Sequence, residues 1–227
     1  MAGRERRTGP AENELRVPQP GRSVRCVIVE LDLAAEGHRP ALRLRPWCAA
    51  DIPDLLASLA SEDPARWPGR FHPGVGVPHE QRWRGPRNNE EATLWLSGQE
   101  RGWACCDWLT FAVLDASQNI VVGHVGLWNR DGGQVGTGQR GEIGYWTAAG
   151  ARGRGIAPAA VRAVTDWAFD HFGAECLPRI MLVHDLDNVA SCRVALKSGY
   201  PFLELSPAKP PLWFTDGHIH LAEAPAS

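Results

Sequence analysis

The sequence lacks the features that would place it in a membrane or outside the cell. No apolar run reaches the roughly 18 residues that a transmembrane helix needs. The first residues contain no apolar core followed by a cleavage site, so we expect no secretory signal. The six cysteines form no Cys-x-x-Cys pair and no Cys/His spacing of the zinc type, so we expect no bound metal. These absences predict a cytoplasmic protein with reduced thiols.

A large excess of either charge is absent as well. The net charge is −2, which gives no reason to expect a nucleic acid or another polyanion as partner. Of the 24 basic residues only Lys197 and Lys209 are lysine, a bias that indicates codon usage more than phosphate recognition. Hydrophobic residues make up 44% and charged residues 22% of the chain, as in ordinary globular proteins. This composition excludes wholesale disorder and allows a sizeable core.

Glycine, proline and tryptophan are abundant instead. The 24 Gly and 18 Pro predict many turns and at least one irregular loop, and the ten Trp fit either a core or a binding cleft. A length of 227 residues allows one domain with a remainder or two small domains. We expect a mobile N-terminal extension over 1–40, in which 24–33 alternates weakly and could add an edge strand, followed by one domain over 41–227.

Hydrophobic periodicity predicts alternating strands and helices from residue 41 onward. Asp51 is expected to cap the first helix, and Asn88 or Asn89 the second. The order of elements predicts an α/β (α+β) fold with a mixed sheet and helices on both faces. The expected strands are 41–45, 109–115, 119–128, 142–147, 179–185 and a closing hairpin over 212–221 around Asp216-Gly217, and the expected helices are 52–59, 89–100, 159–172 and 188–198.

A long segment without periodicity, 61–87, separates the first two helices. It is rich in proline and glycine but also contains several aromatic residues. Loops this long within a compact domain are usually functional or disordered, and the aromatic residues argue against disorder. We therefore expect a functional loop.

The most informative stretch, Y-W-T-A-A-G-A-R-G-R-G-I-A-P-A-A at 145–160, joins a strand to a helix. Gly153 and Gly155 let the backbone approach a ligand, and the first N–H groups of the helix point at the turn. Arg152 and Arg154 add positive charge, so the turn predicts a phosphate or pyrophosphate site. Neither a Walker loop nor a dinucleotide loop fits, because no lysine follows the last glycine and the glycines are spaced G-x-x-G-x-G.

The R-x-x-G-x-A sequence from Arg152 through Gly155 to Ala157 resembles the pyrophosphate-binding motif of the GNAT superfamily of N-acetyltransferases. Other segments resemble its RimJ/RimL-type branch, the ribosomal-protein N-acetyltransferases. These are L-R-P-W at 44–47, E-I-G-Y-W at 142–146, and N-x-x-S followed by K-x-G-Y, formed by Asn188, Ser191, Lys197, Gly199 and Tyr200. The resemblance covers about residues 41–222.

The resemblance implies a mostly antiparallel sheet in which two strands, 142–147 and 179–185, splay apart around acetyl-CoA as cosubstrate. The pantetheine arm is expected between them. The cofactor-binding residues that the resemblance implies are Tyr145, Trp146, Thr147, Arg152, Gly153, Arg154, Gly155, Ile156, Ala157 and Asn188.

The resemblance also suggests catalytic and acceptor residues. Ser191 matches the position proposed to protonate the departing sulfur, although from the residues alone Asn188 is as well explained as a helix cap and Ser191 as a surface residue. Glu142 could receive the amine proton or be a solvent-facing strand carboxylate, and His184 could titrate near neutral pH or be a buried, hydrogen-bonded histidine. The long loop is expected to meet the acceptor through Trp67, His72 and Trp83.

Two functions of different classes follow. The first is an acetyl-CoA-dependent N-acetyltransferase acting on a primary amine, either a peptide or protein N-terminus or a small amine such as an antibiotic, by direct attack on the thioester. The second is a non-catalytic GNAT-like domain that binds acyl-CoA as a sensor or scaffold. The presence of both Asn188 and Ser191 favours catalysis. A monomer and a homodimer both remain open.

Overall fold

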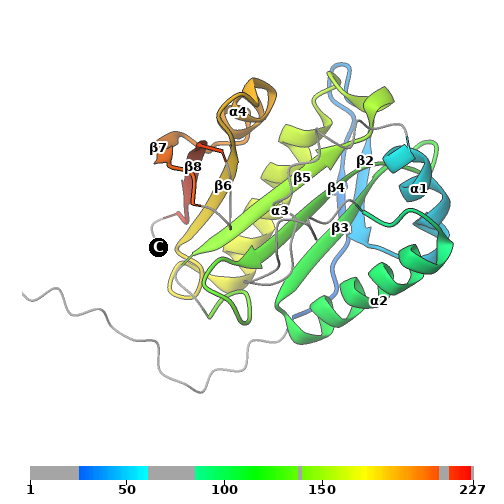
Figure 1. The fold of residues 1–227 in the computed structure, drawn as a ribbon, viewed down its shortest axis with the longest axis horizontal. Coiled ribbons are helices and arrows are strands. Elements are labelled where there is room, and N and C mark those ends of the chain that lie inside the picture. Colours follow the sequence, from blue (N-terminus) through cyan, green and yellow to red (C-terminus); the bar gives the residue numbers. More distant parts are fainter. Residues whose placement is uncertain (1–25, 61–84, 138–139, 210–214, 226–227) are drawn as a thin grey trace, which may run out of the picture.

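One sheet of eight strands runs through the part of the chain that the computed structural model describes, residues 26–60, 85–137, 140–209 and 215–225. Its strand order is β1-β2-β3-β4-β5-β6-β8-β7 (Figure 1). The strands are β1 (Leu31–Leu33), β2 (Leu42–Pro46), β3 (Trp108–Asp115), β4 (Ile120–Asn129), β5 (Gly141–Thr147), β6 (Arg179–Asp185), β7 (Phe202–Ser206) and β8 (Gly217–Glu223). Every neighbouring pair is antiparallel except β5 and β6, which confirms a mixed, mostly antiparallel sheet.

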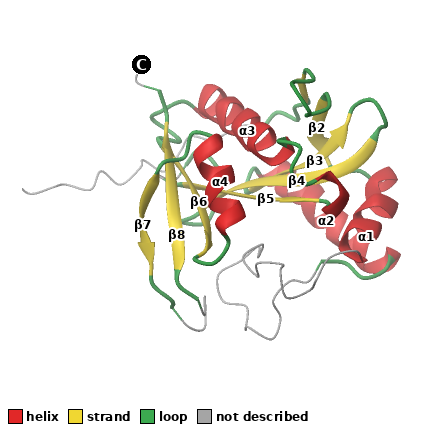
Figure 2. Cartoon of the chain, turned by 90° about the horizontal axis from the view of Figure 1, so that it is seen from above, coloured by secondary structure: helices red, strands yellow, loops and turns green. Residues whose placement is uncertain are grey.

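Helices cover both faces of this sheet, as the element order predicts (Figure 2). The helices are α1 (Ile52–Ala60), α2 (Asn89–Cys105), α3 (Ile156–Phe172) and α4 (Val189–Lys197), with short 3-10 turns η1 (Ala49–Asp51) and η4 (Ala149–Ala151). Within the described ranges, none of these helices is long and apolar enough to cross a membrane.

Two apolar clusters hold the helices on the sheet. The larger one packs α3 against the strands through side chains such as Phe111, Leu127 and Val164, all of which are fully buried. The smaller one packs α1 against the other face through Leu55 and Leu114. Successive residues of a strand point to opposite faces, so the central strands β3, β4 and β5 supply side chains to both clusters.

The cap of α2 agrees with the sequence, but α2 extends five residues beyond the expected end at 100, α3 begins three residues before the expected start at 159, and the expected cap of α1 is wrong. Asn88 caps α2, since its side chain accepts a hydrogen bond from Glu91 N–H at 2.9 Å. Asp51 does not cap α1. It closes η1, where its carboxylate accepts from Cys48 N–H and from both terminal nitrogens of Arg45 at 2.8 Å. Burial opposes ionisation of Asp51, but these hydrogen bonds outweigh burial and lower its pKa.

The second strand of the predicted closing hairpin is present as β8, but its described partners are β6 and β7. Strand β8 begins at Gly217 and pairs with β7, which the sequence analysis missed. Four of the five residues of β7 are exposed at the sheet edge, so its sequence carries no alternation between buried and exposed positions. Asp216-Gly217 consequently lies at the start of a strand, and residues 210–214 lie outside the described residues.

The expectation of reduced thiols is also wrong. Cys26 and Cys106 form a disulfide whose Cα atoms are 5.3 Å apart, across a sequence separation of 80 residues. Strand β1 pairs with β2, which confirms the edge strand that the weak alternation over 24–33 suggested. Within the N-terminal extension, the disulfide at Cys26 and the pairing of Leu31–Leu33 therefore attach the chain to the sheet, while a domain boundary at residue 40 stays a prediction.

Candidate active site

Strands β5 and β6 separate partway along their length. They pair in parallel only where 141–143 faces 180–182. Beyond this point β5 continues to pair with β4, and β6 with β8, but the ladder between β5 and β6 ends. The facing edges thus leave backbone N–H and C=O groups available to an extended ligand. The splayed strand pair implied by the sequence resemblance is present.

The turn after β5 leads directly to the N-terminus of α3. Gly153 and Gly155 have φ values of +76° and +78°, a left-handed conformation that favours glycine. A Cβ atom at either position would meet nothing within 4 Å among the described residues, so the turn is open on its outer side. Gly155 caps α3 without a side-chain hydrogen bond, which leaves the first N–H groups of the helix for an anion.

The two arginines of this turn have partners within the protein. Arg152 Nε donates to the Thr147 carbonyl at 3.1 Å, and Arg154 lies 3.8 Å from the buried carboxylate of Asp115. The Arg154 side chain remains 39% exposed. The turn therefore combines open backbone donors with positive charge, and it fits a pyrophosphate.

Helix α4 places a hydroxyl beside the diverging strands. The Asn188 side chain accepts a hydrogen bond from Ser191 N–H at 3.0 Å, so Asn188 does cap α4. Ser191 is buried, and its Oγ lies 2.9 Å from the Tyr145 hydroxyl of β5. Burial raises the pKa of Tyr145 to about 12, although the hydrogen bond with Ser191 opposes the rise. Tyr145 thus keeps its proton at neutral pH and can donate it.

The two candidate bases from the sequence, Glu142 and His184, each interact with another group of the protein. The Glu142 carboxylate forms an ion pair with Arg130, and its side chain is only 13% exposed, so it does not face solvent freely. His184 is buried at the end of β6, and its Nδ1 lies 2.8 Å from the Asp185 carbonyl oxygen. Because β5 residues alternate between faces, Glu142 lies on the face opposite Tyr145.

An aromatic cluster (Trp47, Trp95, His124, Trp146) occupies the α1 face beside this site. Trp47 Nε1 donates to His124 Nδ1 at 3.0 Å, and the His124 ring lies parallel to that of Trp146. Burial lowers the pKa of His124 to about 3, so its imidazole is neutral at physiological pH. Sequence reasoning missed His124, because a single histidine inside an apolar strand carries no motif.

The structure describes some of the remaining predicted site residues and not others. The Trp146 side chain, assigned to the cofactor from the sequence resemblance, contributes to the aromatic cluster, and Thr147 ends β5. Ile156 and Ala157 begin α3. The three residues assigned to the acceptor, Trp67, His72 and Trp83, lie outside the described residues, so that assignment stays a prediction.

The family model described as Acetyltransferase (GNAT) domain matches residues 41–201. Because the match spans most of the chain, the protein belongs to the GNAT acetyltransferase family. It is an acyltransferase with acetyl-CoA as cosubstrate, as the sequence resemblance implies. No protein with a curated description matches the sequence.

Solved structures share the fold at low sequence identity. RimJ of Mycobacterium smegmatis, solved in complex with CoA-disulfide, is 21% identical with a TM-score of 0.63, covering 82% of this chain and 83% of its own. The ribosomal-protein-S5-alanine acetyltransferase of Vibrio fischeri is 19% identical with a TM-score of 0.62, covering 86% and 97%. The microcin self-immunity acetyltransferase MccE, in complex with acetyl-CoA and AMP, is 14% identical with a TM-score of 0.62, covering 80% and 92%.

Proposed function

We propose that the protein transfers the acetyl group of acetyl-CoA to a primary amine by direct attack on the thioester. The observation that carries the proposal is the Tyr145–Ser191 hydroxyl pair, which lies where β5 and β6 separate. Ribosomal-protein acetyltransferases among the structural neighbours support a peptide or protein N-terminus as the first acceptor to assay. Small amines are assayed as well, and the microcin self-immunity acetyltransferase MccE supports including a microcin among the acceptors.

Acetyl transfer needs a proton at sulfur and the removal of one from nitrogen. Acetyl-CoA supplies the acetyl group on a thioester, and the C–S bond breaks as the new C–N bond forms. Ser191 Oγ gives its proton to the departing sulfur, and Tyr145 replaces that proton through its hydrogen bond; the phenolate left on Tyr145, whose pKa is about 12, then takes a proton from solvent. The proposed donor is therefore a two-hydroxyl relay that ends at Ser191.

The amine proton must leave on the other side of the thioester. Glu142 lies on the opposite face of β5 from Tyr145, so the proposed acid and the proposed base approach from opposite faces. The ion pair with Arg130 fixes the position of the carboxylate, which accepts the proton directly or through water. We propose Glu142 as base on this placement, and Asn188 and the turn 152–157 as cofactor-binding residues.

The proposal is tested by release of free thiol from acetyl-CoA in the presence of primary amines and peptides with free N-termini. The wild-type protein should release thiol with at least one acceptor. Ser191→Ala should lower kcat by about 10- to 100-fold with little change in the KM for acetyl-CoA. Glu142→Gln should remove the acidic limb of the pH–rate profile. Unchanged turnover in Ser191→Ala would remove the assignment of the proton donor.

The chain contains a matched control for the hydroxyl pair. Thr165 Oγ1 and the Tyr200 hydroxyl form a second pair, 2.5 Å apart, in the core between α3 and the end of α4. Thr165→Val leaves the Tyr200 hydroxyl without this partner, so we expect a loss of about 1–2 kcal/mol of stability. Its kcat should equal that of the wild-type protein. If both variants lowered kcat equally, the effect of Ser191 would be one of stability alone.

A further inference from the structure

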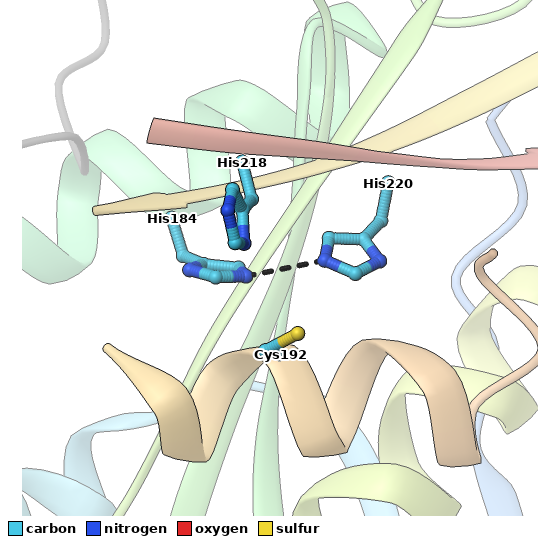
Figure 3. A group of neighbouring side chains, drawn as sticks. All are labelled: His184, Cys192, His218 and His220. Carbon is cyan, nitrogen blue, oxygen red and sulfur yellow. Dashed lines mark hydrogen bonds between the residues drawn. The ribbon is translucent and has the colours of Figure 1, made fainter. Parts of the chain in front are cut away.

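Four side chains with metal-binding atoms lie together between α4 and the strands β6 and β8 (Figure 3). We call them the His/Cys cluster: His184, Cys192, His218 and His220. The candidate ligand atoms all lie within 4.8 Å of one another. They come from three different elements, β6, α4 and β8, and their spacing in the chain matches no zinc motif, which explains why the sequence predicts no metal.

Backbone carbonyl groups determine the tautomer of two of the histidines. His184 Nδ1 lies 2.8 Å from the Asp185 oxygen, and His220 Nδ1 lies 3.0 Å from the Tyr200 oxygen. A carbonyl oxygen only accepts, so each Nδ1 carries the hydrogen and each Nε2 presents a lone pair. Ligating histidines in metal sites commonly have this arrangement, with the second ring nitrogen donating to a carbonyl.

The two Nε2 atoms face each other at 3.2 Å. Two lone pairs at this distance repel unless a cation lies between them. Zinc binds imidazole at about 2.0–2.1 Å in a tetrahedron, which places neighbouring nitrogens roughly 3.3 Å apart. The observed separation fits two ligands on one zinc ion, and it equally fits a hydrogen bond from a protonated imidazole to a neutral one, so the test below must distinguish zinc from a proton.

The third histidine supplies independent evidence. His218 Nδ1 is buried and has no hydrogen-bond partner among the described residues. A buried nitrogen without a partner is costly, and coordination through Nδ1 would satisfy it. The Phe202 ring packs edge-on against His218 and against His220, so one side of the cluster is apolar. Cys192 approaches the histidines from α4, as Figure 3 shows.

We propose that the His/Cys cluster binds one Zn²⁺ ion through three neutral imidazole nitrogens and the thiolate of Cys192. The thiol loses its proton to solvent as the S–Zn bond forms. Thiolate and imidazole ligands suit zinc, and four protein ligands leave no open position, which is typical of a structural site. The ion would link α4 to β6 and β8 and so stabilise the helix that carries Ser191. This proposal does not depend on the proposed function.

The test uses the full-length, untagged protein after treatment with a chelator and dialysis against zinc or cobalt(II). We expect close to one tightly bound zinc per chain by elemental analysis. Cobalt(II) should give the visible bands of a tetrahedral site and a thiolate-to-cobalt charge-transfer band. Cys192→Ser should abolish the charge-transfer band, and His218→Gln should weaken zinc binding by at least about 100-fold.

Matched controls replace exposed residues of the same types. Cys48 and His38 are exposed and lie outside the cluster, so Cys48→Ser and His38→Gln should keep both the stoichiometry and the spectrum. Zinc should also raise the Tm of the wild-type protein but not that of Cys192→Ser. A wild-type protein that retains no zinc and gives no charge-transfer band would overturn the proposal even if both cluster variants failed to fold. Zinc binding that is unchanged in both variants would also overturn it.

Discussion

The β5–α3 turn and the aromatic cluster adjoin the same strand but are built in different ways. The turn is made of consecutive residues, and what it offers is backbone: two glycines with positive φ and the first N–H groups of α3. The cluster is made of Trp47, which follows β2, and of side chains from α2, β4 and β5, held by ring contacts and the bond from Trp47 to His124. One region depends on local conformation, and the other on contacts between distant segments.

This difference separates the expected effects of mutation. Changes in the turn should alter affinity for CoA and lower stability less than the loss of a contact between distant segments, because few buried contacts depend on the turn. Changes in contacts between distant segments should lower stability first, because each such contact closes a long loop of the chain. The predictions below test this separation.

The largest effect is expected at the disulfide, the link of longest sequence separation described above. Closing 80 residues between Cys26 and Cys106 restricts the unfolded chain, so Cys26→Ser should cost about 3–4 kcal/mol. Urea unfolding under non-reducing conditions measures this cost. The matched control is Cys105→Ser, since Cys105 is exposed, free and adjacent to Cys106. Equal stabilities of the two variants would show that the disulfide contributes nothing.

An effect of about 2 kcal/mol is expected from His124 on acidification. Its pKa is lowered to about 3 in the folded protein, while the unfolded chain binds a proton near the ordinary value of 6.5. The stability from the neutral, buried ring is therefore fully present above about pH 6.5 and is lost as the pH falls towards 3. Between pH 7 and pH 5 the wild-type protein should lose about 2 kcal/mol more than His124→Gln, which does not titrate.

Urea unfolding at several pH values measures this difference. The other histidines are the same in both proteins, so the difference between the two slopes isolates His124. The exposed His38 provides the control, because His38→Gln should keep the wild-type slope. If His124→Gln had the same slope as the wild-type protein, the histidine would be protonated within the fold, and the aromatic cluster would not exclude charge.

The same difference explains what the sequence could predict. The conformation of the turn can be predicted from the sequence because its glycines, the end of β5 and the start of α3 all lie within a few consecutive residues. Strand β6 was also predicted, because its continuous apolar run requires burial on both faces. The Cys26–Cys106 bond, the His/Cys cluster and the role of His124 depend on which segments the sheet brings together. No local pattern encodes such contacts, and β7, exposed at the edge, carried no pattern at all.

The smallest effect on stability and the most specific effect on binding are expected at Gly155. Valine there would have to adopt φ near +78°, which costs about 1–2 kcal/mol and is relieved by moving the N–H groups of the turn. Gly155→Val should therefore raise the Kd for CoA about 10-fold in calorimetric titration. Gly150→Val adds the same bulk to an exposed position of the same turn that has no positive φ, and it should bind CoA as the wild-type protein does.

The pair of variants distinguishes a backbone site from a side-chain site. If Gly150→Val weakened binding as much as Gly155→Val, bulk at the turn would be the cause, and the left-handed backbone would not matter. If neither weakened it, the affinity would come from Arg152 and Arg154 rather than from the N–H groups of α3. If the backbone holds CoA, only Gly155→Val should lose affinity for it. Gly150→Val should keep both the affinity and the Tm of the wild-type protein.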